Sequence, residues 1–175
     1  MALTGSEVAV TSLALVSVLR RAVTVVVPAA DVVLRLPRTA AVDADPTVGL
    51  HLFRVEAAAS PTPALAPRPA GAAARRPRTW ELDYVISFGG ESGGVLAQIM
   101  LGLVVDALTA TPVVSANDGI AAFQTLHPDL PPPTEIESIR AVPLALSGTD
   151  RAALWSMLST PYQLSVEYRA YLQTN

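Results

Sequence analysis

The chain has 175 residues, enough for one compact domain, and 51% of them are hydrophobic whereas only 15% are charged. Its formal net charge is −3 and it offers no basic stripe to neutralise phosphates, so nucleic acid is not an expected partner. The sequence contains no cysteine, which excludes disulfides, thiolate nucleophiles and cysteine-based metal sites within it.

The N-terminal segment predicts one amphipathic helix that ends at two arginines. Apolar side chains recur at helical spacing from Val8 to Leu19, and Arg20 and Arg21 follow them near the negative end of the helix. The segment lacks a basic start, and its arginines fall where a membrane span needs apolar residues. We therefore expect neither a signal peptide nor membrane insertion.

Three strands are predicted before residue 90. Residues 32–36 form a short strand, and residues 48–55 form a longer one in which strict alternation puts Val55 on the same face as His51. In the third, at 80–88, large apolar side chains face one way and Glu81, Asp83 and Ser87 face water or a partner. Residues 57–79, rich in Ala, Pro and Arg, predict a flexible loop inside the domain.

The second half of the chain predicts three helices and two strands. A helix covers residues 95–108, a short one follows at 118–126, and a third begins at a Ser147 cap and ends near residue 159. Strands are predicted at 135–146, where Pro143 indicates an edge or a bulge, and at 164–172. The predicted buried stripe of the helix at 95–108 is Val95, Leu96, Ile99, Met100, Leu103, Val104, Ala107 and Leu108.

Together these elements predict a single domain over residues 1–175. Because no regular βαβ alternation appears, the pattern favours an α+β fold. We expect a mixed or antiparallel sheet with helices packed mainly on one face.

No constellation of residues predicts catalysis. The two histidines, His51 inside a strand and His127 beside Pro128, are isolated, so they give little support for a catalytic set or a metal site. The glycine-rich turn at 89–94 lacks the lysine of a phosphate-binding loop and carries Glu91, which would repel phosphate. We expect no catalytic, cofactor-binding or metal-binding residues, and a protein that is not an enzyme.

The C-terminal stretch carries the most specific pattern. Residues 143–169 read PLALSGTDRAALWSMLSTPYQLSVEYR, in which a P-L-x-L strand leads into a helix ending in L-W-x-x-L, then T-P-Y and a final strand. This resembles the signature that closes the N-terminal domain of cap proteins, the tail terminators of extracellular phage-tail-like contractile injection systems. The matching residues are Pro143, Leu144, Leu146, Leu154, Trp155, Leu158, Thr160, Pro161, Tyr162, Leu164, Ser165, Tyr168 and Arg169.

The resemblance implies a tail-terminator-like fold and a structural role. Such caps form a homohexameric ring at the distal end of the tail, contact the inner tube protein and the sheath protein, and end the growth of both. It further implies assembly in the bacterial cytoplasm and then a place in the contractile particle, whether that particle stays in the cytoplasm or is released.

Exposed strand edges would be natural places to accept a strand from the sheath or the tube. The candidate edges are the strands at 32–36 and 164–172, and the candidate assembly interface on the latter is Glu167, Arg169 and Tyr171. Two alternatives stay open: another tail-assembly or sheath-associated subunit of the same particle, and a small-molecule-binding protein or hydrolase.

Overall fold

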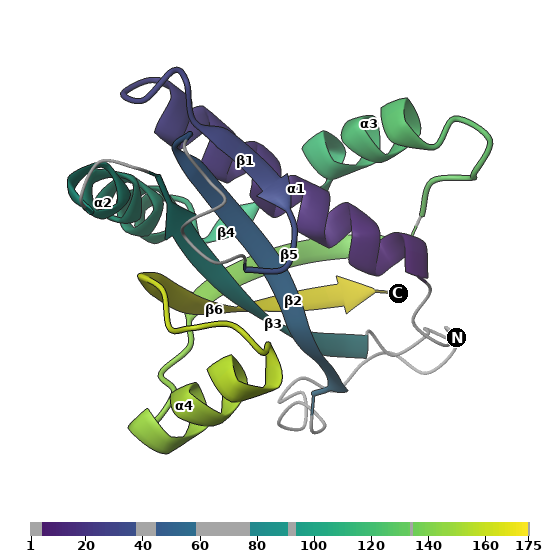
Figure 1. The fold of residues 1–175 in the computed structure, drawn as a ribbon. Helices are drawn as coiled ribbons and strands as arrows, with labels where there is room; N and C mark the ends of the chain where they lie inside the picture. The colour runs from purple at the N-terminus through teal and green to yellow at the C-terminus, as the bar shows by residue number, and fades with distance from the viewer. Residues whose placement is uncertain (1–4, 38–44, 59–77, 91–93, 134, 175) are drawn as a thin grey trace, which may run out of the picture.

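The computed structural model describes residues 5–37, 45–58, 78–90, 94–133 and 135–174 of the chain. In these ranges, four helices and six strands form an α+β fold (Figure 1). The helices are α1 (Gly5–Thr24), α2 (Val95–Ala110), α3 (Ala116–Leu126) and α4 (Gly148–Met157). The strands are β1 (Asp31–Leu34), β2 (Thr47–Ala57), β3 (Arg78–Gly89), β4 (Val113–Val114), β5 (Ile136–Pro143) and β6 (Ser165–Thr174).

The strands form one mixed sheet in the order β1-β2-β3-β6-β5-β4. β1 runs parallel to β2, and all the other neighbouring strands are antiparallel, which confirms the predicted class. The long strands β2, β3 and β6 are adjacent, so β3 and β6 each have a neighbour on both sides. The expectation that the final strand is a free edge is therefore wrong.

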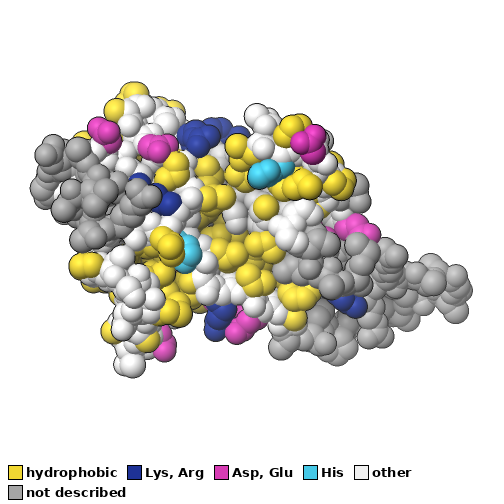
Figure 2. Space-filling view, turned by 45° about the vertical axis from the view of Figure 1, so that its right-hand side comes forward, with side chains coloured by type: hydrophobic (Ala, Val, Ile, Leu, Met, Phe, Trp, Pro, Cys, Tyr) yellow, Lys and Arg dark blue, Asp and Glu magenta, His cyan; other side chains and the backbone are white. Residues whose placement is uncertain are grey.

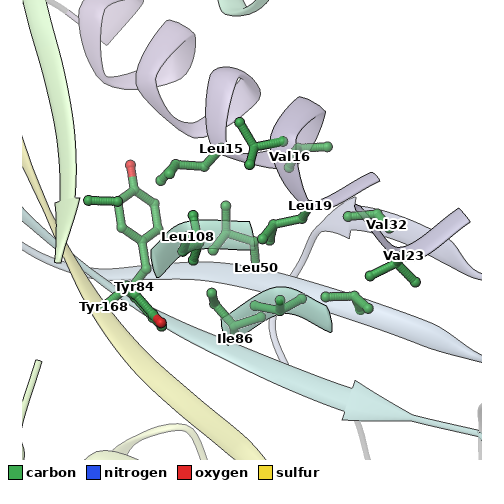
Figure 3. Packing of buried hydrophobic residues seen from close by; sticks show 14 of the residues in the cluster. Leu15, Val16, Leu19, Val23, Val32, Leu50, Tyr84, Ile86, Leu108 and Tyr168 are labelled. Atoms are coloured by element: carbon green, nitrogen blue, oxygen red, sulfur yellow. The ribbon is translucent and has the colours of Figure 1, made fainter. Parts of the chain in front are cut away.

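One face of the sheet carries the main hydrophobic core. On β3 this face consists of Leu82, Tyr84, Ile86 and Phe88, all at most 4% exposed, and it packs beneath α1 and α2. Figure 3 shows α1 side chains such as Leu19 pointing toward the strands. α3 packs beside α1, so closely that a Cβ built on Gly119 would lie 2.2 Å from the backbone oxygen of Val10.

The opposite face carries a smaller apolar cluster under α4. There Val85 of β3 packs with Leu154 and Trp155 of α4. Figure 1 shows α4 well apart from α1, α2 and α3. The prediction of helices mainly on one face is thus confirmed.

The prediction that the second face of β3, with Asp83 and Ser87, is open to solvent is wrong. Asp83 is 1% exposed and Ser87 is 5% exposed. The strand lies at the centre of the sheet between β2 and β6, so side chains from both neighbours, together with α4, cover its second face.

The predicted buried stripe of α2 is wrong in part. The fully buried residues are Ala97, Met100, Val104 and Leu108, whereas Val95 and Ile99 are 62% and 44% exposed. The helix is apolar nearly all round, so its sequence pattern does not tell which side meets the sheet.

Strand pairing takes up both ends of the predicted loop at 57–79. Ala57 of β2 pairs with Trp80, and Arg78 of β3 pairs with Thr174. Residues 59–77 lie outside the described part of the chain. The Ser147 cap is confirmed, because its Oγ accepts a hydrogen bond from the Asp150 amide at 3.1 Å.

Candidate assembly surfaces

The sheet offers β1 as its longer free edge. Within the described part of the chain, this four-residue strand pairs only with β2, and the exposed side chains of Leu34 and Leu36 lie on it and just beyond it. The other edge strand, β4, has two residues. The predicted edge at 32–36 is confirmed in place, with the strand itself at Asp31–Leu34.

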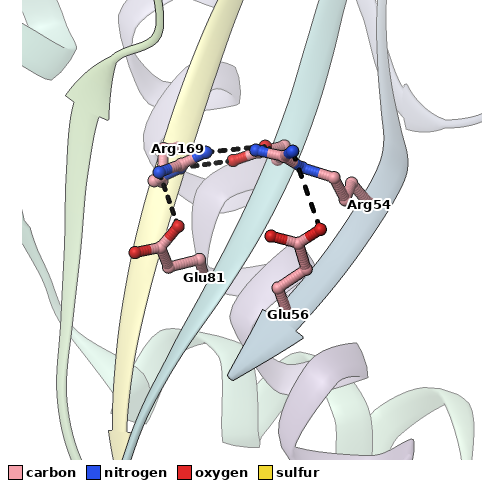
Figure 4. Close-up of polar contacts among 5 residues, drawn as sticks. Arg54, Glu56, Glu81 and Arg169 are labelled. Carbon is pink, nitrogen blue, oxygen red and sulfur yellow. Dashed lines mark hydrogen bonds and ion pairs between the residues drawn. The ribbon is translucent and has the colours of Figure 1, made fainter. Parts of the chain in front are cut away.

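A network of charges lies on the face of the sheet that also carries α4, and Figure 4 shows it. We call its five residues, Arg54, Glu56, Glu81, Asp83 and Arg169, the charged face. Asp83 is the centre: Arg169 donates from Nε to Oδ1 at 2.6 Å and from Nη2 to Oδ2 at 3.0 Å, and Arg54 donates from Nε to Oδ2 at 2.7 Å. Glu81 pairs with Arg169, and Glu56 pairs with Arg54.

A β-bulge brings Arg54 into this network. Leu52 pairs with Tyr84 on the core face, but the register then shifts and Arg54 pairs with Asp83. The extra residue reverses the alternation of β2, so Arg54 and Glu56 join the charged face. Val55 instead pairs with Leu82, whose side chain is on the core face, which corrects the prediction that Val55 shares a face with His51.

Arg169 bonds two carboxylates of the charged face, those of Asp83 and Glu81. Hydrogen bonding to Asp83 raises the pKa of Arg169 above its ordinary value, and Tyr171 and Glu81 add to this shift. Two guanidinium groups meet three carboxylates across β2, β3 and β6. All five residues of the charged face thus have a partner within the chain.

A second ion pair attaches α4 to the sheet. Arg151 of α4 donates to Glu167 at 3.2 and 2.8 Å from its Nε and Nη2, and Glu167 is only 5% exposed. This bonding to Glu167 raises the pKa of Arg151. Two of the candidate interface residues, Glu167 and Arg169, are therefore already paired within the chain, and Tyr171 lies with them on the same face of β6.

The residues of the C-terminal pattern support α4 and its attachment. Leu154, Trp155 and Leu158 belong to the cluster on Val85, and the Leu144 amide donates to the Glu167 carbonyl at 2.9 Å. Pro143 pairs with Tyr168 at the end of β5. The ring of Tyr162 packs edge-on against Trp155 with centroids 5.5 Å apart, yet Tyr162 is 61% exposed. Pro161 is exposed, and Thr160 and Ser165 are half-buried.

The histidines take no part in a shared site. His51 lies on β2 opposite Val85, and burial lowers its pKa, whereas His127 stacks on Phe123 at the end of α3. Among the described residues, no cluster of three or more His, Cys, Asp and Glu could hold a metal ion. In the same ranges, no helix has the length and apolar character needed to cross a membrane.

The sequence did not predict the groove between α1 and α3. It has a volume of about 410 Å³ and is lined by Ser17, Arg20, Arg21, Thr24, Asp118 and Ala121. Arg21 bonds Asp118 at 2.6 Å, and Arg20 donates to the Val32 carbonyl of the edge strand at 2.8 Å. Two arginines against one aspartate leave this groove net positive. Elsewhere the surface has apolar areas with charged side chains at their margins, as one face shows in Figure 2.

Comparisons with known proteins bear on family and fold. The profile of the Pvc16 N-terminal domain matches residues 10–173. The chain is similar to the sheath/tube terminator, in its extended state, of the extracellular contractile injection system PVC, with a TM-score of 0.60, 15% identity and coverage of 99% of this chain and 57% of that one. It is also similar to the tube-terminating cap of the anti-feeding prophage, with a TM-score of 0.57, 15% identity and coverage of 92% and 52%. The chain thus spans little more than half the length of either, and no curated protein sequence matches it.

Proposed function

Because the chain belongs to the Pvc16 N-terminal domain family, we propose that it is a tail-terminator subunit that caps the distal end of a contractile injection particle. The observation that carries this proposal is the fold, which is shared over nearly the whole chain with two proteins described as terminating caps. The capping subunit ends the growth of both the inner tube and the sheath.

The proposed mechanism is termination by a template. Subunits close into a homohexameric ring, and unlike patches meet at every contact around it, because a rotational ring requires heterologous interfaces. One side of the ring reproduces the contacts of the next tube or sheath layer, and the other side offers no surface for a further layer. The partners are therefore the chain itself, the inner tube protein and the sheath protein, with no nucleic acid and no membrane insertion.

The proposed role is structural and needs no chemistry. Arg54 and Arg169 pair with Asp83 on the sheet, and Glu167 pairs with Arg151 of α4, so these charges hold the fold together and none of them is placed as a reactive group. The subunit joins the particle in the bacterial cytoplasm, and the finished particle then stays there or is released.

The test is tail length. In a strain that assembles the particle, deletion of the gene should give tails of broad, excessive length in negative-stain micrographs, and expression of this chain should restore a narrow length distribution. Averaged views of the restored distal end should show a six-fold ring. Tails of unchanged length after deletion would contradict the proposal, as would a chain that is absent from the tail end.

A further inference from the structure

The outward side of α2, here called the outward stripe, exposes two large apolar side chains, a glycine position and one acid. Val95, Ile99, Gly102 and Asp106 follow one another at helical spacing, directly opposite the buried residues of the same helix. Val95 and Ile99 are 62% and 44% exposed. An amphipathic surface helix normally turns polar groups outward, so this stripe departs from the usual pattern.

Gly102 is a second, independent observation on the same stripe. It lies within α2, where a glycine costs about 1 kcal/mol relative to alanine. A Cβ built there meets no atom within 4 Å, so packing within the described chain gives no reason for the missing side chain. A glycine on an apolar helix face allows another backbone or side chain to approach closely.

The same chain carries a complementary surface at the groove between α1 and α3. Val25 and Val26, which are 81% and 55% exposed, follow directly after α1 and so lie beside the end of the groove that carries Arg20 and Arg21. Asp106 is the only charged residue of α2, and it is exposed. Apolar groups and an acid on α2 therefore match apolar groups and a net positive charge at the groove.

We infer that the outward stripe of α2 docks against the groove between α1 and α3 of a second copy of this chain, with Asp106 beside Arg20 of that copy. The inference rests on the proposed ring, and it names the two unlike patches that such a ring requires. Stripe and groove lie on different elements of one protomer, so repeating the contact produces a chain of subunits that can close. Two copies of α2 packed on each other would instead stop at a dimer.

Cysteine cross-linking tests the contact directly, because the natural chain has no cysteine. An Ile99→Cys chain is mixed with a differently tagged Val25→Cys chain and oxidised. We expect a disulfide between the two tags at least tenfold more abundant than in a control that pairs Ile99→Cys with Met157→Cys. Met157 is 65% exposed on α4, away from both patches. A predominant link between two Ile99→Cys chains, or no link above the control, overturns the inference.

Charge exchange provides the second test. Asp106→Arg should lower the apparent association constant at least tenfold in sedimentation velocity, and Asp106→Arg with Arg20→Asp in one chain should restore it. Ile99→Glu should weaken association similarly, whereas Met157→Glu should not.

If Ile99→Glu leaves rings intact and tails of normal length, the inference fails while the terminator role stands. If the unaltered chain does not restore tail length, the terminator role itself fails. Binding of the unaltered chain to lipid vesicles that Ile99→Glu abolishes, without the cross-link, assigns the stripe to a membrane and also overturns the inference.

Discussion

The two faces of the sheet are held by different physical forces. The face under α1 and α2 is apolar, with Leu50, Leu82 and Ile86 at most 2% exposed. The opposite face centres on a carboxylate that is 1% exposed between two arginines. Burial of apolar area depends only weakly on NaCl and has no preferred direction, whereas paired charges depend on geometry and ionic strength. The core face therefore contributes most of the buried apolar area, whereas the charged face joins β2, β3 and β6 through Asp83.

The largest expected effect comes from the core face. Leu50→Ala removes a side chain that is 1% exposed and leaves a cavity beneath α1, so the free energy of unfolding should fall by about 3 kcal/mol. Urea unfolding at low and high NaCl measures this loss, which should be the same at both concentrations. Leu126→Ala, at a site 60% exposed, should change stability by less than about 0.5 kcal/mol. A salt-dependent loss at Leu50 would contradict the assignment of forces.

A smaller, salt-dependent effect is expected on the charged face. Asp83→Asn keeps the shape but removes the carboxylate that lies between Arg54 and Arg169, and the loss of this shared partner should cost about 2 kcal/mol. The estimate is below that for a fully buried pair because the Arg54 side chain is 44% exposed and water screens it. High NaCl should reduce the loss by screening the two arginines from each other. Glu56→Gln, at a side chain 54% exposed, is the matched control and should have little effect; an equal loss in both variants would show that the network contributes nothing particular.

These two faces also explain how far the sequence predicts the fold. Alternation and capping predicted five of the six strands to within a few residues, the Ser147 cap and a mixed or antiparallel sheet, because those signals are local. The C-terminal pattern predicted the family, which the profile match confirms. The core face of β3 was predicted correctly for the same reason.

The charged face was not predictable from local pattern. An aspartate that alternates with apolar residues indicates a wet position, but the arginines that bury Asp83 lie 29 and 86 residues away along the chain. Arg54 reaches it only through a bulge, which strict alternation misses. The interior position of β6 likewise follows from strand order, which no single segment specifies. The role of Glu167, Arg169 and Tyr171 in assembly stays a prediction, and the first two already have partners within the chain.

The outward stripe of α2 and the groove at Arg20 were missed for a related reason. A helix that is apolar all round predicts burial on every side, and only the position of the sheet reveals which side remains outside. The signal available in the sequence was Gly102, a glycine within a strong helical pattern that no turn or cap requires.

The smallest expected effect lies on the core face itself, at the buried hydroxyl pair of Tyr84 and Ser12. Tyr84 and Ser12 share a hydrogen bond of 2.9 Å, and Ser12 also donates to the Val8 carbonyl at 3.0 Å. Tyr84→Phe removes one neutral bond and leaves Ser12 a partner, so the loss at pH 7 should be about 1 kcal/mol.

Burial raises the pKa of Tyr84 above the usual 10, so the unfolded chain loses this proton above pH 10 while the folded chain keeps it. Above pH 10, this difference should lower the free energy of unfolding of the natural protein by about 1.4 kcal/mol per pH unit. Tyr84→Phe has no such hydroxyl and should lack this part of the decrease. Unfolding curves measured from pH 8 to 11 should show the stabilities of the natural protein and Tyr84→Phe converging. Tyr162→Phe, at an exposed ring, is the control and should follow the natural protein throughout. A constant difference between Tyr84→Phe and the natural protein would mean that water reaches the Tyr84 hydroxyl in the folded chain.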